Sequence, residues 1–220
     1  MPAMATTDSV SAYATRTMRR RVIVALVGAG VLAAMAFNTT VVTIGGEADL
    51  RQQAFNPDAF GVQEFPRIRD FVSENAPDAV KLANELDADR NAAIAAYGTM
   101  AGAFPVIPVS FTGTAGEGSS GIFEVSVDSL PDGVGIRVQT GPAINGTELR
   151  DITGDIVFGD FTNQIEFQNV GAGINRAMAA EVLSDLDRDS LTGQTVSVTG
   201  VFTMINPQNW LVTPVAFEVQ

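Results

Sequence analysis

The sequence has no cysteine and no histidine among its 220 residues. Without cysteine the chain cannot form disulfide bonds or use a thiol nucleophile, and without histidine it cannot build a Ser-His-Asp triad. Zinc sites made of thiolate and imidazole ligands are excluded for the same reason. We therefore expect a protein that is not an enzyme and that carries no cofactor.

Basic side chains are also scarce. The chain has 13 Lys and Arg against 25 Asp and Glu, which gives a formal net charge of −12. Four of the basic residues, Arg16, Arg19, Arg20 and Arg21, lie near the N-terminus, so the remainder of the chain is still more acidic. A negative surface repels the phosphates of nucleic acids, and we expect no nucleic-acid partner.

One long apolar run lies near the N-terminus. It extends from Val22 to Phe37 without a charged residue and directly follows three consecutive arginines. A basic cluster before an apolar run is typical of a secretion signal or a membrane anchor, with the basic side in the cytoplasm. We expect residues 1–21 to be a disordered basic lead-in. Residues 22–44 are then a transmembrane anchor or signal segment that places the rest of the chain on the periplasmic side of the inner membrane.

Residues 47–100 have the periodicity of helices. Apolar side chains recur every three to five residues along this stretch, which is the spacing of a buried helical face. We expect one helix over residues 66–75, with Pro66 in its first turn, and a second over residues 78–97, ended by Gly98. This helical region is expected to pack against the β region that follows.

Residues 104–220 are predicted to form a mainly β domain. Short runs of alternating apolar residues are separated by Gly, Pro, Ser and Thr, a pattern that indicates strands and turns. We expect strands over residues 106–111, 121–127, 134–138, 148–158, 194–204 and 211–219, and one helix over residues 164–186. A single helix before the last two strands of a small domain is the order of the OB-fold, a Greek-key barrel in which that helix lies between strands 3 and 4.

The predicted fold class is therefore α+β. It consists of an N-terminal membrane or signal helix, a helical linker region, and an OB-like barrel with one helix between strands 3 and 4. A β-sandwich or a split-sheet α+β arrangement is the alternative.

A group of polar residues brackets the strand predicted before the long helix. Arg150 and Asp151 lie near its start, and Asp160, Asn163 and Gln164 follow it. A guanidinium, two carboxylates and two amides could bind the hydroxyls of a sugar-like ligand, or a partner protein. In the structural alternative, Arg150 pairs with a neighbouring carboxylate, and one of the two amides caps the helix.

An acidic motif resembles the opening of a calcium loop. Asp185, Asp187 and Asp189 have the D-x-D-x-D spacing, but Ser190 occupies the sixth position and Val196 the twelfth. An EF-hand needs glycine and glutamate there. We therefore expect no metal site and interpret the motif as an exposed acidic helix end.

Three motifs resemble a known family. They are GPAINGTELRD at residues 141–151, IVFGDFTNQIE at 156–166 and WLVTPV at 210–215. They are similar to elements of DUF2291, a family of predicted periplasmic lipoproteins often associated with sugar ABC-transport systems. No activity is established for the family, so the resemblance implies a periplasmic location and an association with sugar transport systems. Lipid attachment would need a cysteine after the apolar run, and residues 37–40 here read FNTT, so the apolar segment itself would have to hold the protein.

Together these observations predict an exported, membrane-anchored accessory protein of solute uptake, specifically sugar ABC uptake. Its expected partners are the inner membrane, through residues 22–44, and a transporter component or small polar ligand. One alternative is a carboxylate-based envelope glycan hydrolase, which would need two acids roughly 5–10 Å apart in a pocket. The other is a purely structural envelope assembly protein.

Overall fold

The computed structural model describes residues 21–35 and 55–220, which belong to two separate units of the chain. Residues 21–35 form a helix in which every residue is exposed. Within these two described ranges, no helix combines the length and the apolar character needed to cross a bilayer. The membrane or signal role of residues 22–44 stays a prediction, and residues 36–44 lie outside the described residues. So does the predicted lead-in, apart from Arg21.

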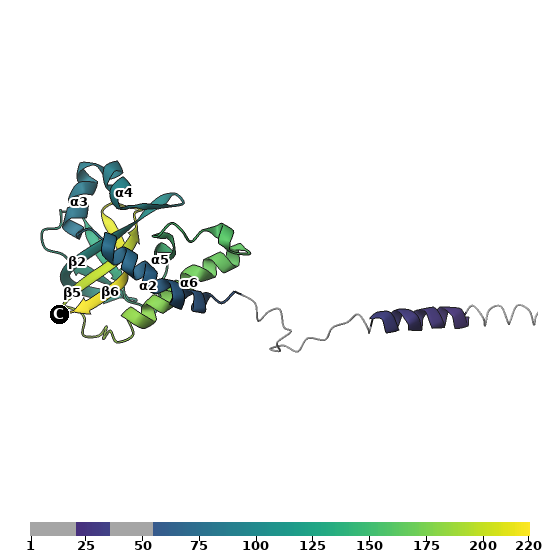
Figure 1. The fold of residues 1–220 in the computed structure, drawn as a ribbon. Helices are drawn as coiled ribbons and strands as arrows, with labels where there is room; N and C mark the ends of the chain where they lie inside the picture. Colours follow the sequence, from purple (N-terminus) through teal and green to yellow (C-terminus); the bar gives the residue numbers. More distant parts are fainter. Residues whose placement is uncertain (1–20, 36–54) are drawn as a thin grey trace, which may run out of the picture. The chain divides into compact units, whose positions relative to one another are not determined.

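The second unit, Phe55–Gln220, has helices arranged around strands (Figure 1). Its strands are β1 (Thr99–Ala101), β2 (Phe104–Ser119), β3 (Ile122–Ser126), β4 (Gly135–Gln139), β5 (Thr195–Thr203) and β6 (Asn209–Val219). Its helices are α2 (Pro57–Asn75), α3 (Ala79–Ala88), α4 (Arg90–Tyr97), α5 (Glu148–Asp151), α6 (Gln164–Val182) and the short 3₁₀ helix η2 (Phe158–Asp160). The predicted α+β class is confirmed, with the long helix α6 between β4 and β5.

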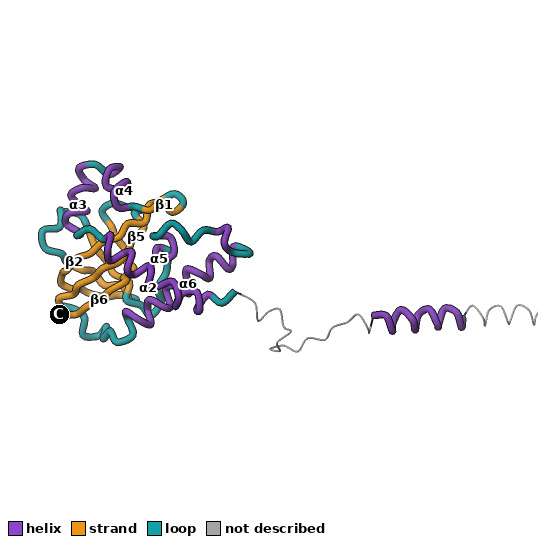
Figure 2. The backbone as a smooth tube through the Cα atoms, viewed as in Figure 1, coloured by secondary structure: helices purple, strands orange, loops and turns teal. Residues whose placement is uncertain are grey.

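Strand β2 closes the sheet into a barrel, which Figure 2 shows as one group of strands. The first half of β2 pairs with β5 and its second half pairs with β3, both antiparallel. Thr114 lies at the change of partner, opposite Ser126 on one side and Thr195 on the other. The circuit continues through β4 and β6, which are parallel to each other, and back to β5. This closure is that of an OB barrel and excludes the sandwich alternative.

Two apolar cores hold the unit together. The barrel interior is centred on Trp210, whose ring stacks on Phe202 with centroids 4.7 Å apart, and α3 and α4 contribute Leu82, Leu86 and Ala93 to the same core. The second core lies between the outside of the barrel and helices α2, α5 and α6. The helical region and the β region therefore pack on one another, as the sequence predicts.

Two glycines let α2 and α6 meet backbone to backbone, and the two helices lie side by side in Figure 1. A Cβ atom on Gly61 would lie 2.3 Å from the carbonyl oxygen of Gly173, and one on Gly173 would lie 2.0 Å from the carbonyl oxygen of Pro57. Both distances are far shorter than a van der Waals contact. Any larger residue at either position would push the helices apart.

Helix α2 begins at Pro57, well before the predicted start near Pro66. The Asn56 side chain accepts hydrogen bonds from the two amides that follow Pro57, at 3.0 and 3.1 Å, and proline suits the first helical position. Pro66 lies inside the helix and has no amide to donate. The helix continues through it because Phe65 and Ile68 are fully buried in the core shared with α6.

The single helix predicted over residues 78–97 is two helices, α3 and α4. The break is at Asp89, whose amide donates to the carbonyl oxygen of Glu85 at 2.9 Å. Its carboxylate accepts from the amide of Ala92 at 3.0 Å. One residue thus ends the first helix and caps the second. Gly98 ends α4 as predicted.

The strand predicted over residues 148–158 is wrong, because this segment contains α5 and η2. Leu149 and Ile152 are both fully buried. Their separation of three residues places them on one helical face, whereas it would place them on opposite faces of a strand. The helix predicted over residues 164–186 is confirmed as α6 but ends at Val182. The remaining predicted strands are confirmed as β2 to β6, and β1 is an additional strand.

Candidate functional site

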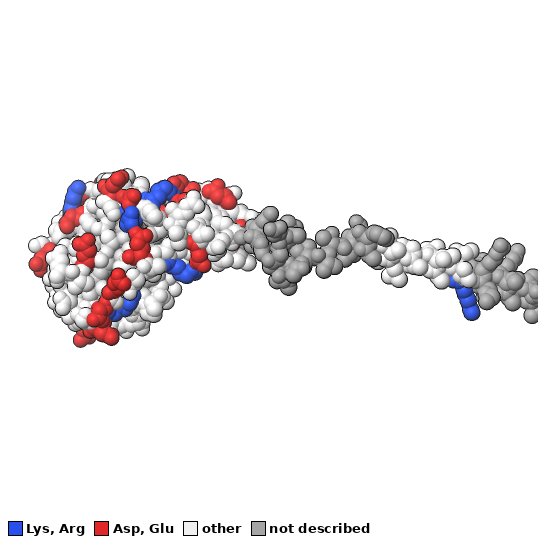
Figure 3. All heavy atoms as spheres, turned by 60° about the horizontal axis from the view of Figure 1, so that its bottom comes forward, with Lys and Arg blue, Asp and Glu red and all other residues white. Residues whose placement is uncertain are grey.

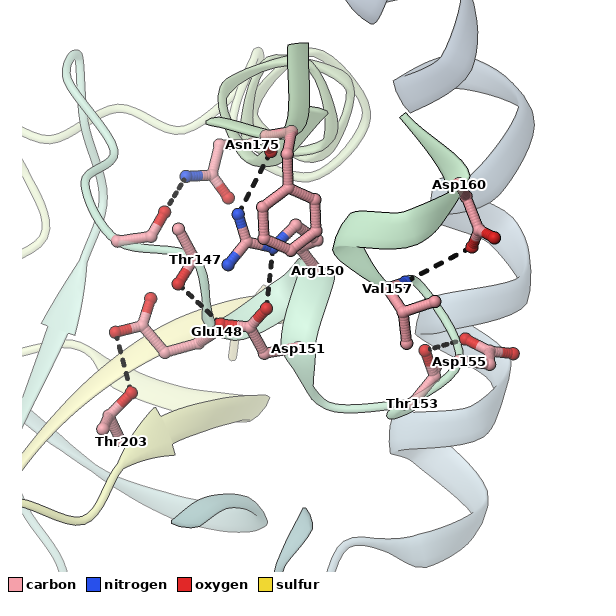
Figure 4. Close-up of polar contacts among 12 residues, drawn as sticks. Thr147, Glu148, Arg150, Asp151, Thr153, Asp155, Val157, Asp160, Asn175 and Thr203 are labelled. Carbon is pink, nitrogen blue, oxygen red and sulfur yellow. Dashed lines mark hydrogen bonds and ion pairs between the residues drawn. The ribbon is translucent and has the colours of Figure 1, made fainter. Parts of the chain in front are cut away.

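Arg150 is a buried charged side chain on α5, only 8% exposed. Its Nε donates to Oδ1 of Asp151 at 2.7 Å, and its Nη1 donates to the carbonyl oxygen of Phe167 at 3.1 Å (Figure 4). The guanidinium carbon lies 3.8 Å from the centroid of the Phe167 ring. Oδ2 of Asp151 in turn accepts from the Thr147 hydroxyl at 2.6 Å. The ion pair is therefore fixed from both sides by its neighbours.

These side chains line an open groove of about 480 Å³, which we call the Arg150 groove. Its apolar walls come from β1 and from the segment that contains η2, and they include Met100 and Phe158. The Phe158 side chain is 53% exposed. Nη2 of Arg150 has no hydrogen bond within the described residues, and the one buried unpaired side-chain atom there is Oε2 of Glu148. Nη2 is therefore unpaired among the described residues without being fully buried.

Side chains from β4, from α6 and from the loop between α6 and β5 hold the loop that leads into α5. Gln139 exchanges two hydrogen bonds with the backbone of Asn145, each 3.0 Å long. Asn175 on α6 donates to the carbonyl oxygen of Gly146 at 3.0 Å, and Nε of Arg188 donates to the carbonyl oxygen of Thr140 at 2.7 Å. Sequence analysis missed the roles of Asn175 and Arg188 because these residues lie 29 and 48 positions from their partners in the chain. The loop positions Thr147, and through it Asp151.

The other predicted site residues lie apart from the Arg150 groove. Oδ1 of Asn163 accepts from the amide of Glu166 at 2.9 Å, so Asn163 caps α6. Gln164 is exposed and its side chain forms no hydrogen bond within the described residues. Asp160 is exposed and lines a different groove. The structure thus brings two of the five predicted residues together and places the other three elsewhere.

That second groove, of about 360 Å³, lies between α2 and the segment before α6. Arg67 at its rim donates to both carboxylate oxygens of Asp155, at 2.7 and 3.2 Å, and this hydrogen bonding raises the pKa of Arg67. A hydrogen bond from the Thr153 hydroxyl holds the pKa of Asp155 below its ordinary value. Ile156 lines both grooves. The charges of Arg67 and Asp155 satisfy one another, while the carboxylate of Asp160 accepts from the amide of Val157 at 3.4 Å.

Glu148 is a buried carboxyl group beside Arg150 that sequence analysis did not single out. Its Oε1 accepts from the Thr203 hydroxyl of β5 at 3.2 Å, while Oε2 is buried without a partner. Burial raises the pKa of Glu148 above its ordinary value. A Cβ on Gly146 would lie 2.0 Å from Oε2, so the carboxyl group fits here because residue 146 is a glycine. No local sequence signal shows this burial, because β5 creates it.

Within residues 21–35 and 55–220, no three acidic side chains are grouped so that they could hold a metal ion. In the acidic motif, the carboxylate of Asp187 accepts from the amide of Asp189 at 3.1 Å. Its geometry is that of a local turn.

A search of solved structures found an OB-fold protein from Thermotoga maritima, known from a crystal structure. The two share 21% sequence identity with a TM-score of 0.61, and the match covers 76% of this chain and 99% of that chain. At this identity the likeness shows the fold alone. The chain is therefore an OB-fold protein in which additional helices surround the barrel.

A family model described as "Predicted periplasmic lipoprotein (DUF2291)" matches residues 22–218. The chain belongs to the DUF2291 family, as the three motifs predict. The family description supports a location in the cell envelope. No curated protein matches the chain.

Proposed function

We propose that this protein is a non-enzymatic binding protein of the cell envelope, held at the periplasmic side of the inner membrane, that assists solute uptake by a sugar ABC transporter. The Arg150 groove is its binding site, for a small polyhydroxylated solute such as a monosaccharide. The observation that carries this proposal is the free Nη2 of a buried, rigidly held arginine in an open groove with an exposed aromatic ring.

The chemistry of the groove suits a sugar. Guanidinium nitrogens donate to hydroxyl oxygens, and a carboxylate accepts from hydroxyl hydrogens. In the Arg150–Asp151 pair the two groups are adjacent and oriented by Thr147. Phe158 offers an exposed apolar face for the C–H groups of a ring. The volume of about 480 Å³ is within the roughly 300–1,000 Å³ range of small-molecule sites.

Binding is favoured over hydrolysis in this groove. Glycoside hydrolysis by carboxylates uses an acid and a second carboxylate on either side of the bond. Asp151 is the one acidic residue among the described side chains that line the groove. It is also already engaged by Arg150 and Thr147.

The test is a thermal-shift screen of the full-length protein in detergent against a panel of monosaccharides. We expect at least one to raise the melting temperature of the wild type and not that of Phe158→Ala. The matched control is Val62→Ala, an exposed apolar side chain on α2 that lines none of the grooves described here, and it should respond like the wild type. If no monosaccharide stabilises the protein, or if Phe158→Ala responds fully, the groove is not a sugar site.

A further inference from the structure

A polar hollow on the outside of the barrel is larger than the Arg150 groove and distinct from it. It has a volume of about 640 Å³ and lies over β3 and β4, between the β3–β4 loop and the β5–β6 loop. Its lining is mainly polar and includes Glu124, Asp132, Arg137, Gln208 and Asn209. None of these residues takes part in the site described above.

Strand alternation directs these side chains outward. Phe123 and Val125 enter the barrel core, so Glu124 between them faces the outside. Ile136 and Val138 place Arg137 outward in the same way, and the register sets Arg137 directly opposite Glu124. A carboxylate and a guanidinium therefore stand side by side in the hollow.

The two charged groups nevertheless do not pair. Nε and Nη2 of Arg137 both donate to Oδ1 of Asn209, at 3.3 and 2.9 Å, because the parallel register brings β6 beside β4. Glu124 forms no salt bridge or hydrogen bond through its side chain within the described residues. The hollow thus presents a free carboxylate, the Nη1 donors of Arg137 and the amide hydrogens of Asn209. Each of these groups can bind a hydroxyl.

Charge and composition exclude one class of OB-fold ligand. Nucleic-acid sites on this fold combine basic grooves with aromatic side chains on which bases stack. The lining of this hollow contains no aromatic residue, and Glu124 and Asp132 outnumber Arg137. The net charge of −12 adds to the repulsion of phosphates, and acidic side chains are spread over the face of the protein that Figure 3 shows.

We propose that this hollow, which we call the barrel-face site, binds a neutral oligosaccharide. In OB barrels, oligosaccharides and oligonucleotides bind to the face of the second and third strands, beside the loop between the first and second strands and the loop between the fourth and fifth. The two strands correspond here to β3 and β4 and the second loop to the β5–β6 loop, and all three line the hollow, whereas the β2–β3 loop does not. Glu124 accepts from hydroxyl groups, and Arg137 with Asn209 donates to them. The site does not depend on the function proposed for the Arg150 groove.

The test is isothermal titration of the full-length protein with three neutral trisaccharides, maltotriose, cellotriose and chitotriose, and with oligo-dT as a nucleic-acid probe. We expect at least one trisaccharide to bind and oligo-dT not to bind. Glu124→Gln should weaken the binding by about tenfold or more, because a hydrogen bond to a charged group is lost. Glu117→Gln, an exposed acid at the end of β2 outside the hollow, should leave it unchanged.

Three results would overturn the proposal: no trisaccharide binds, oligo-dT binds, or Glu124→Gln binds as tightly as the wild type. The Phe158→Ala variant separates this test from the previous one. Trisaccharide binding that survives Glu124→Gln and disappears in Phe158→Ala would place the ligand in the Arg150 groove and count against the barrel-face site.

Discussion

Arg150 is held twice by Phe167, through its guanidinium carbon 3.8 Å from the ring centroid and through Nη1 donating to the carbonyl oxygen at 3.1 Å. A planar guanidinium can make both contacts and still donate Nε to Asp151, whereas an ammonium group cannot. The same arrangement leaves Nη2 free. Phe167 thus fixes the orientation of the buried guanidinium of Arg150.

Replacing this arginine by lysine should therefore destabilise the fold although the charge is kept. We expect Arg150→Lys to lower the free energy of unfolding by about 2 kcal/mol, because a charge-assisted hydrogen bond and the ring contact are lost. Arg176→Lys is the control, because its ion pair with Asp58 is exposed. It should change stability by less than about 1 kcal/mol. Urea denaturation measures both, and equal effects would contradict the structural role of Arg150.

Glu148 should make stability depend on pH. Burial raises its pKa in the folded state, so the folded protein holds this proton more tightly than the unfolded chain. The corresponding stability is present below the ordinary carboxyl pKa and is lost as the pH rises through the raised value. As the pH rises from acidic to neutral, the free energy of unfolding of the wild type should therefore fall relative to that of Glu148→Gln. A difference that stays constant with pH would contradict the burial of an ionisable group here.

The contact between α2 and α6 should tolerate no side chain at Gly61. Alanine normally stabilises a helix relative to glycine by up to about 1 kcal/mol. At Gly61 the added Cβ would lie 2.3 Å from the carbonyl oxygen of Gly173, and overpacking of this kind costs roughly 1–3 kcal/mol or more. We therefore expect a net loss in the thermal stability of Gly61→Ala. Gly159→Ala, where a Cβ meets nothing within 4 Å, should be close to neutral.

Asn163 should matter for the helix rather than for a ligand. Removing its cap in Asn163→Ala should cost about 1 kcal/mol of stability. The thermal shift given by a monosaccharide in the Arg150 groove should remain, since Asn163 does not line that groove. The neighbouring Gln164→Ala is the matched control and should change neither quantity. If Asn163→Ala no longer responded to the monosaccharide, Asn163 would be part of the binding site and this prediction would be wrong.

The sequence predicts the barrel well because strand alternation is a local signal. Val134, Ile136 and Val138 alternate along the chain, and the last two are buried in the barrel. Prediction from the sequence fails where elements far along the chain decide which residues are buried. Ile152 and Ile156 have strand-like spacing, yet α6 and β5 pack on this segment and favour the short helix α5 instead.

The candidate site was predictable in part for the same reason. Arg150 and Asp151 are adjacent in the chain, so their pairing could be inferred, and the structural alternative expected either Asn163 or Gln164 to cap the helix, of which Asn163 does so. The partners Phe167 and Thr203 could not be inferred, because α6 and β5 bring them to α5 from far along the sequence. Asp160 is placed in another groove by the turn that η2 makes.

The most direct test of the proposed function is an NMR titration that follows the side-chain Nε–H signal of Arg150 while a monosaccharide from the thermal-shift screen is added. We predict that this signal and the backbone signals of residues 147–158 shift together and saturate, while those of Glu124 and Arg137 stay in place. A saturating titration in which the Arg150 signal does not move would contradict the claim that the Arg150 groove binds the solute.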